Sequence, residues 1–185
     1  MALTHRQRIM IIGQPGSGKS TLARMLGDLL ELPVVHIDRI HWQPGWKERE
    51  PTEKGRLCHE VHIRPAWVFE GGHSATWPER LERADTLIWL NFPVSVRAWR
   101  VILRTLKHHG NSRPDLPDGC PEHFNWEFTH WIWSTRNTGR LKMHKFFEAA
   151  PATKEKHQLR SRDEVEAFLT ELGRETSTVT KKVTQ

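Results

Sequence analysis

The stretch Gly13-Gln14-Pro15-Gly16-Ser17-Gly18-Lys19-Ser20 determines how the rest of the sequence is interpreted. It matches the pattern G-x-x-x-x-G-K-[ST], a loop whose backbone N–H groups surround phosphate oxygens. Glycine is required because a Cβ would hold the backbone away from a bound anion. The apolar run Arg8–Ile12 precedes the loop, and apolar residues at helical spacing follow it from Lys19 to Leu30. The sequence therefore predicts a buried strand, a phosphate-binding loop and a helix, rather than a glycine-rich turn without a ligand.

The residues of this loop have expected roles in holding a nucleoside triphosphate. The ammonium group of the lysine approaches the β- and γ-phosphates, and the serine hydroxyl is a ligand for Mg²⁺. The N-terminus of the following helix adds a favourable dipole. We expect ATP and Mg²⁺ as cofactors, bound by Gly13, Pro15, Gly16, Ser17, Gly18, Lys19, Ser20 and Thr21.

Strand-like and helix-like segments alternate along the rest of the chain. Strands are predicted at Val34–Ile37, Ala66–Phe69, Thr86–Leu90 and Lys156–Leu159, and helices at Pro93–His109, His123–Ala150 and Ser161–Leu172. This alternation predicts an α/β fold with three layers, in which helices flank a parallel sheet. We expect one domain over residues 1–172, with a lid at about 110–122, and a disordered tail over 173–185.

Several polar residues follow predicted strands and are expected to meet at one edge of the sheet. Ligands bind at the carboxyl ends of parallel strands, where Gly13, Asp38, Glu70 and Asn91 fall. Asp38 is a candidate to orient or deprotonate an acceptor hydroxyl, or to join the water shell of Mg²⁺; the alternative is a helix cap. Glu70 is a candidate magnesium ligand through water, or the partner of a nearby lysine or arginine.

Three arginines, Arg97, Arg100 and Arg104, share one face of the predicted helix 93–109. Guanidinium groups are suited to clamp the charge that spreads over a phosphoryl group in transfer, although a solvated basic face has the same pattern. Arg113 lies in the loop Gly110–Pro121 and is the candidate lid arginine. The apolar stripe of the same helix consists of Trp99, Ile102, Leu103 and Leu106.

Aromatic residues follow Asp38 closely. His41, Trp42 and Trp46 form either the wall of an acceptor pocket or part of the core. Trp126, Trp131 and Trp133 are expected to pack in the core rather than to contact a ligand.

The composition favours a cytoplasmic protein with anionic ligands. The 185 residues carry a formal net charge of +6, which suits phosphates, nucleotides or nucleic acid. No apolar run approaches the ~18–20 residues that span a bilayer, so we expect no membrane association. The two cysteines indicate a reducing compartment and exclude a disulfide-stapled scaffold. The oligomeric state is open.

The ordered series of motifs resembles a known family. Besides the phosphate loop it comprises the arginine helix and five segments: His36–Trp42, Trp67–Gly71, Ala84–Leu90, Cys120–Glu127 and Leu159–Ser161. From about Ile9 to Leu169 the chain resembles the adenylate-kinase-like, FlaR-related "DNA topology modulation" kinases. This resemblance implies a five-stranded parallel sheet of order 2-3-1-4-5 and an arginine-bearing lid. It also implies ATP-dependent phosphoryl transfer, an acceptor site that includes Gly71, and Arg160 beside the adenine. The family has Asp-Gly where this chain has Glu70-Gly71.

These features favour a kinase that transfers the γ-phosphoryl group of ATP to a small acceptor, either a nucleotide or another metabolite. A GTPase would need N/T-K-x-D, which the sequence lacks. The alternative is a nucleic-acid-associated ATPase, consistent with the basic charge, although no nucleic-acid motif is present. A third reading is a regulatory module that binds ATP without transferring it.

Overall fold

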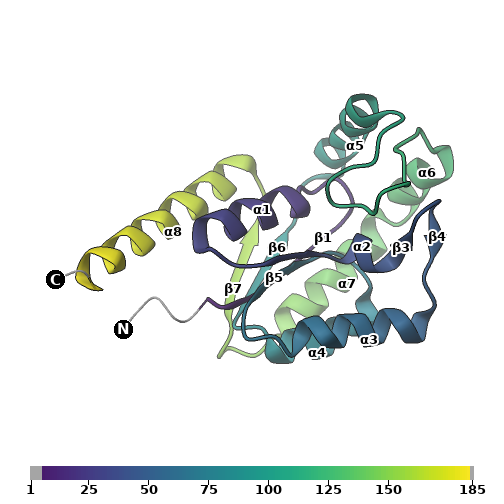
Figure 1. The fold of residues 1–185 in the computed structure, drawn as a ribbon. Coiled ribbons are helices and arrows are strands. Elements are labelled where there is room, and N and C mark those ends of the chain that lie inside the picture. Colours follow the sequence, from purple (N-terminus) through teal and green to yellow (C-terminus); the bar gives the residue numbers. More distant parts are fainter. Residues whose placement is uncertain (1–5, 184–185) are drawn as a thin grey trace.

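The computed structural model describes residues 6–183 and is built around a five-stranded parallel sheet (Figure 1). The strands lie in the order β2-β5-β1-β6-β7. Counted along the chain, this is the expected order 2-3-1-4-5, so the predicted α/β architecture is confirmed. The strands are β1 (Arg8–Gly13), β2 (Val34–His36), β5 (Trp67–Glu70), β6 (Thr86–Leu90) and β7 (Glu155–Leu159).

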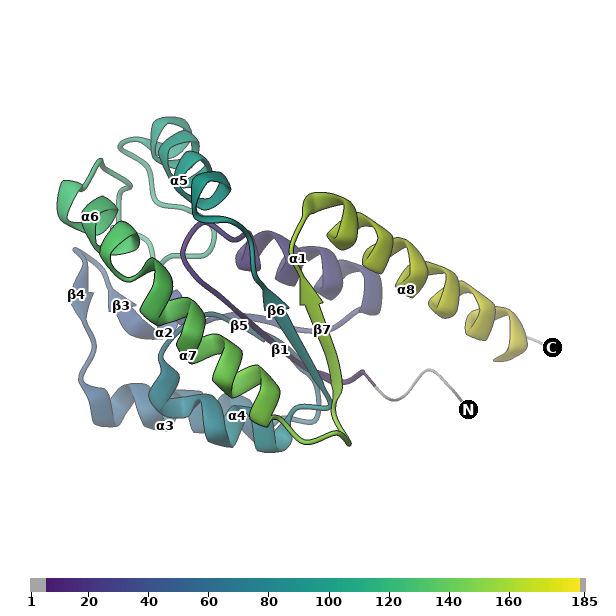
Figure 2. The same ribbon diagram turned by 180° about the vertical axis from the view of Figure 1, so that it is seen from behind.

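Helices cover both faces of the sheet, as the views in Figures 1 and 2 show. One face packs against α1 and α8, and the other against α3, α4 and α7. Alternate residues of β1 divide between the two cores: Met10 and Ile12 pack on one side, Ile9 and Ile11 on the other. The helices are α1 (Lys19–Leu30), α3 (Pro51–His62), α4 (Trp77–Arg83), α7 (Arg136–Ala149) and α8 (Arg162–Val183).

The remaining elements gather at the carboxyl end of the strands. They are α2 (Ile37–His41), the hairpin of β3 (Trp42–Gln43) and β4 (Lys47–Glu48), the 3₁₀ turn η1 (Ser74–Thr76), α5 (Val94–His108) and α6 (Trp126–Ser134). In both ribbon views α5 and α6 lie together beyond this end of the sheet. The segment between them, which includes the predicted lid, has no helix and contains two isolated β-bridges.

The structure differs from the sequence prediction around Asp38. The predicted strand Val34–Ile37 ends one residue earlier, at His36, and the chain turns directly into α2. Asp38 therefore lies in the first turn of a short helix rather than at the end of a strand. The hairpin β3–β4 and helices α3 and α4 were not predicted, because their sequences lack a clear apolar period.

Two predicted boundaries in the C-terminal half were wrong. The helix expected over His123–Ala150 is two helices that meet at Thr135, where Gln14 Nε2 donates to the backbone oxygens of Thr135 and Arg136 at 3.3 and 3.1 Å. Thr135 O also accepts from Gly139 N at 2.9 Å, so Gln14 is an additional donor that joins the phosphate loop to this junction.

The tail from Gly173, expected to be disordered, continues α8 as far as Val183. Leu172 is buried, and Arg6 donates to Glu175 at 2.5 Å, so packing and an ion pair hold this extension to the body. The prediction for residues 184–185 lies outside the described residues.

The apolar stripe of α5 faces the opposite way from the usual arrangement of a surface helix. Trp99, Leu103 and Leu106 are 61%, 45% and 71% exposed, whereas Arg97 is 2% exposed. The expectation that Trp126, Trp131 and Trp133 pack in the core was also wrong, because all three side chains are about half exposed or more. None of the described helices is both long and apolar enough to cross a membrane.

Candidate active site

The phosphate loop leaves β1 and enters α1 in the conformation that its glycines allow. Gly16 and Gly18 have φ values of 78° and 94°, in the left-handed region that glycine adopts without strain. A Cβ on Gly16 would lie 2.3 Å from the backbone oxygen of Arg97. The glycine at this position therefore allows α5 to pack directly against the loop. Ser17 N donates to Gln14 O at 3.2 Å and closes the turn.

The side chains of the loop have the placement expected for phosphate binding. Lys19 Nζ donates to Gln14 O at 3.3 Å, so the ammonium group reaches back across the loop. Its pKa is lowered, mainly because burial removes water from the charged form, and the nearby carboxylates of Glu70 and Asp38 oppose this shift. Thr21 is exposed in the first turn of α1.

Two of the three predicted arginines contact the loop itself. Arg97 donates from Nε to Phe92 O and from a terminal nitrogen to Pro15 O at 3.3 Å. Arg100 donates to Ser17 O at 3.2 Å and lies over the ring of Phe92 at 4.3 Å. Both guanidinium groups therefore hold the backbone of the phosphate loop through its carbonyl oxygens. Direct contact of either with a phosphate stays a prediction.

Two carboxylates converge on the hydroxyl of Ser20. Ser20 Oγ lies 3.0 Å from Glu70 Oε1 and 3.2 Å from Asp115 Oδ2. Glu70 also pairs with His36 Nδ1 at 2.8 Å. Burial opposes ionisation of Asp115, but the positive charge of Arg113 and hydrogen bonds outweigh it and lower the pKa of Asp115.

This set of oxygens fits Mg²⁺. One hydroxyl hydrogen can be donated to only one of the two carboxylates, so three oxygen-bearing groups lie close together with a single proton between them. Hydroxyl and carboxylate oxygens are the ligands that Mg²⁺ prefers, and beside phosphates the ion takes few protein ligands and keeps several waters. Among residues 6–183 no group of three or more His, Cys, Asp or Glu side chains has the arrangement of a complete metal site. A shared site completed by phosphate oxygens and water agrees with both observations.

Asp38 lies beside this cluster. Burial and the neighbouring charge of Glu70 raise the pKa of Asp38 from 3.8 to about 6. The positive charges of Lys19 and Arg113 act in the other direction. A carboxyl group whose pKa is raised toward neutral pH in this way has the properties of a general base.

The predicted lid loop packs onto the same cluster. Arg113 pairs with Asp115 Oδ2 at 3.0 Å and with Glu122 Oε2 at 2.7 Å, and all three side chains are less than a tenth exposed. Arg104, the third arginine of α5, reaches Glu122 Oε1 at 3.3 Å. Burial lowers the pKa of Arg104, and the positive charge of Arg113 adds to this effect. Arg104 and Arg113 therefore bind the loop to α5 and to the carboxylates.

The other wall is formed by the β3–β4 hairpin. His41 and Trp42 meet edge to face at 4.5 Å between ring centroids, and Trp42 meets Trp46 at 5.4 Å. Lys54 Nζ is nearly buried and donates to Glu48 at 2.6 Å. Burial and the charge of Lys54 lower the pKa of both His41 and His73. His41, Trp42 and Trp46 therefore pack against one another and are partly buried, and their role as the wall of an acceptor pocket stays a prediction.

The hairpin and the lid loop are joined to each other. Gly45 N donates to Gly119 O at 2.8 Å, Trp46 Nε1 donates to Pro121 O at 3.0 Å, and Cys120 Sγ lies 3.3 Å from Gln43 O. These contacts hold the hairpin and the lid loop in a fixed position relative to each other.

Gly71 follows Glu70 with a φ of 119°. A Cβ there would lie 2.1 Å from Ile37 Cγ2, so the glycine allows β5 to pass close to the start of α2. This supports a structural role for Gly71 and leaves its contact with a substrate as a prediction. Arg160 is exposed just after β7 and donates to the side chain of Gln158 at 2.8 Å. Its predicted place beside the adenine is likewise not tested.

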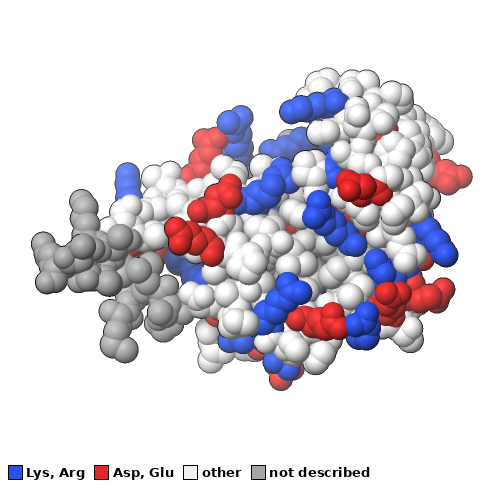
Figure 3. Space-filling model, viewed as in Figure 1, with Lys and Arg blue, Asp and Glu red and all other residues white. Residues whose placement is uncertain are grey.

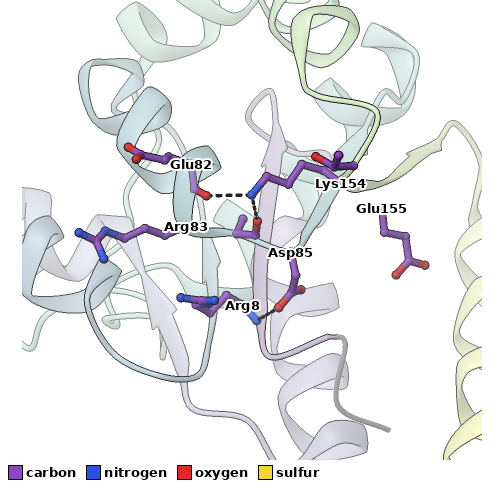
Figure 4. A pocket seen from close by; sticks show the side chains of 8 residues that line it. Arg8, Glu82, Arg83, Asp85, Lys154 and Glu155 are labelled. Carbon is purple, nitrogen blue, oxygen red and sulfur yellow. Dashed lines mark hydrogen bonds between the residues drawn. The ribbon is translucent and has the colours of Figure 1, made fainter. Parts of the chain in front are cut away.

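A cavity of about 660 Å³ lies away from these residues, at the opposite ends of the strands (Figure 4). Lys154 donates there to the backbone oxygens of Glu82 and Ala84, and Asp85 accepts from the backbone of Arg8. The charged side chains of this cavity connect neighbouring strand ends through these hydrogen bonds to the backbone.

In sequence, this chain is similar to curated kinases over part of its length. No protein-family model matches it, so the resemblance to FlaR-related proteins stays a prediction. A cytidylate kinase of Pyrobaculum calidifontis is 32% identical over 110 residues, which are 52% of this chain and 59% of that protein. A shikimate kinase of Halorhodospira halophila is 29% identical over 62% of this chain and 70% of that protein. Its curated relatives are kinases. The chain spans about 60% of the length of the cytidylate kinases that it matches.

Solved structures show the same fold over almost the whole chain. Shikimate kinase from Acinetobacter baumannii, determined with shikimate, has a TM-score of 0.55 and 16% identity, covering 96% of both chains. A gluconokinase from Sinorhizobium meliloti has a TM-score of 0.53 and 16% identity, covering 94% of this chain and 97% of its own. The α/β fold of this chain is therefore the fold of P-loop kinases.

Sequence reasoning missed several residues of the site. Asp115 was not predicted as a site residue, because it lies in a loop rather than at a strand end. Its position two residues after Arg113 could have indicated that the two side chains pair. Lys54 and His73 had no motif around them, and His36, which begins the segment His36–Trp42, was given no role of its own. Gln14 is a variable position of the loop pattern, and only the fold shows that it anchors the junction of α6 and α7.

Proposed function

We propose that this protein is an ATP- and Mg²⁺-dependent kinase that phosphorylates a hydroxyl group of a small metabolite. The observation that carries the proposal is the arrangement around Ser20. The phosphate loop, two carboxylates and Asp38 meet at one end of the sheet, between the lid loop and the aromatic hairpin. The sequence relatives, all of which are named kinases, support the same reaction class.

ATP binds with its phosphates in the loop Gly13–Ser20 and its adenine toward Arg160. The backbone N–H groups and Lys19 hold the β- and γ-phosphates, and Arg97 and Arg100 keep the loop rigid through its carbonyl oxygens. Ser20, Glu70 and Asp115 would hold Mg²⁺. When bound, the ion neutralises charge on the phosphate oxygens.

Asp38 accepts the proton of the acceptor hydroxyl. An alcohol must lose its proton as it attacks phosphorus, and a carboxylate with a pKa of about 6 is ionised at neutral pH yet basic enough to assist. A nucleoside monophosphate already presents an anionic oxygen and needs no such base. The raised pKa of Asp38 therefore favours an alcohol acceptor over a nucleotide.

His41, Trp42 and Trp46 form the wall against which the acceptor lies. A neutral imidazole can both donate to and accept from the hydroxyl groups of a polyol or cyclic alcohol. Closure of the lid loop, with Arg104 and Arg113, excludes water that would otherwise take the phosphoryl group.

The proposal is tested by following ADP release with a panel of sugar acids, polyols, cyclic hydroxy acids and nucleoside monophosphates. We expect one alcohol class to raise the rate at least a hundredfold over the rate without acceptor. Lys19→Ala is the control and abolishes the reaction. Duplex DNA is included as a further arm: stimulation by DNA alone would indicate a nucleic-acid-associated ATPase, and an unchanged rate with every acceptor would contradict the kinase assignment.

A further inference from the structure

Helix α5 is turned so that its charged face points inward. Arg97 and Arg100 contact the phosphate loop and Arg104 contacts Glu122. A helix on the surface of a globular protein normally buries its apolar stripe and exposes its charges. Here the arginines bind the phosphate loop and the lid loop, so the apolar stripe of α5 faces outward.

The exposed stripe joins apolar residues of α6 in one surface. A groove of about 350 Å³ separates the two helices and is lined by Ile102 on one side and by Trp126 and Trp133 on the other. In Figure 3 the upper right of the molecule, where Figure 1 places α5, α6 and the loop between them, is mainly white. We define the α5–α6 surface as Trp99, Ile102, Leu103, Leu106, Trp126 and Trp133, which are 39–71% exposed.

The area of this surface is that of an interface rather than of scattered apolar residues. Trp99, Trp126 and Trp133 are 61%, 70% and 56% exposed. With about 200 Å² for a large aromatic side chain, these three residues alone present on the order of 400 Å². The aliphatic residues add to this, so two such surfaces in contact would remove on the order of 1,000 Å² from water, the lower limit for a specific protein interface.

The charges on the two helices distinguish between possible partners. The exposed charged residues of α5 and α6 are one lysine, Lys107, and one glutamate, Glu127. An anionic lipid surface would favour several exposed lysines or arginines around the tryptophans, but the arginines of α5 point inward. The guanidinium of Arg136, at the start of α7, also lies 4.4 Å from the centre of the Trp133 ring, so three charged groups border the surface. A surface with few charges and many aromatic side chains has the composition of a protein interface core, and Lys107 and Glu127 can pair across a two-fold axis.

We propose that the α5–α6 surface is the interface of a homodimer, in which a second copy of this chain packs its own α5–α6 surface around a two-fold axis. The two copies bury their tryptophans against each other, and Lys107 of each copy faces Glu127 of the other. Because this interface lies on the outer side of α5, it leaves the phosphate loop on the inner side free. The proposal does not depend on the function assigned to the site.

The test is the molar mass in solution, measured by light scattering during size-exclusion chromatography over a range of protein concentrations. We expect the mass of a dimer for the wild-type chain and that of a monomer for Leu106→Glu. The dissociation constant of the dimer should be at least tenfold lower for the wild type than for the variant. Leu103→Glu is a second variant of the same surface. Leu141→Glu is the matched control, since Leu141 is 52% exposed on α7 and lies outside the α5–α6 surface.

Several outcomes would overturn the proposal. One is a wild-type chain that stays monomeric at every concentration. If this monomer also co-sediments with vesicles that contain anionic lipid, the surface binds a membrane instead. Another is a dimer that survives both Leu103→Glu and Leu106→Glu, or one that Leu141→Glu disrupts equally. Hydrogen exchange gives an independent readout: the backbone of α6 should become more protected as the wild-type concentration rises, but not in Leu106→Glu.

Discussion

Replacing Asp38 with asparagine should stabilise the protein while removing its activity. Burial and the charge of Glu70 raise the pKa of Asp38 from 3.8 to about 6. The folded state therefore holds the proton of Asp38 more tightly than the unfolded chain does. As pH rises through 3.8, Asp38 ionises first in the unfolded state, so the free energy of unfolding of the wild-type protein falls. It stops falling once pH exceeds about 6, where Asp38 is ionised in both states.

The size of this effect follows from the shift. A little over two pKa units at about 1.4 kcal/mol each amount to about 3 kcal/mol of lost stability at pH 8, and to about 1.6 kcal/mol at pH 5. Asparagine keeps the shape of the side chain without the charge. Asp38→Asn should therefore raise the free energy of unfolding by up to these amounts, with a larger gain at pH 8 than at pH 5.

The assay is urea denaturation of the ligand-free protein at both pH values, alongside ADP release with the acceptor. Phosphoryl transfer should fall by about 10²- to 10⁴-fold in the variant, as expected for loss of a general base. Asp118→Asn is the control because Asp118 is exposed in the same region, and its stability should match the wild type at both pH values. Equal free energies of unfolding for wild type and Asp38→Asn at pH 8, or a gain that does not grow from pH 5 to pH 8, would refute the reasoning.

Three further substitutions test the packing and the metal site. Gly16→Ala should cost at least about 2 kcal/mol in thermal unfolding, because its Cβ would meet α5, whereas Gly45→Ala has the same φ of 78° but open space and should cost clearly less. Arg113→Ala should cost about 3 kcal/mol in urea unfolding because it leaves the buried Asp115 without its cation and Glu122 with Arg104 alone, while loss of the exposed pair of Arg162 should be undetectable. Glu70→Gln should raise the Mg²⁺ concentration for half-maximal ADP release about tenfold, and an unchanged magnesium dependence would count against the proposed site.

The sheet and the phosphate loop could be predicted from sequence because they rest on local patterns. Continuous apolar runs mark β1 and β6, which are buried on both faces, and the spacing of glycines, lysine and serine identifies the loop. Two of the strand ends then brought Gly13 and Glu70 into one site as expected. These features depend on the residues themselves rather than on distant partners.

The features that could not be predicted depend on long-range contacts. The periodicity of α5 revealed two faces but not which one points inward, since that choice depends on loop carbonyls some 80 residues earlier in the chain. The junction of α6 and α7 likewise contacts Gln14, more than 120 residues earlier in the chain. Asp115 enters the site only because the loop that carries it folds over Ser20. Loop residues of this kind need the three-dimensional structure to be found.

Binding of ATP·Mg²⁺ tests the central claim most directly, because every role given to the site depends on a triphosphate held by residues 13–20. Isothermal titration calorimetry of the purified chain should give binding of one ATP per chain in the presence of Mg²⁺, much weaker binding after chelation of the metal, and none in Lys19→Ala. A titration of the wild-type chain without measurable heat across several temperatures, or binding that Lys19→Ala leaves unchanged, would contradict the account.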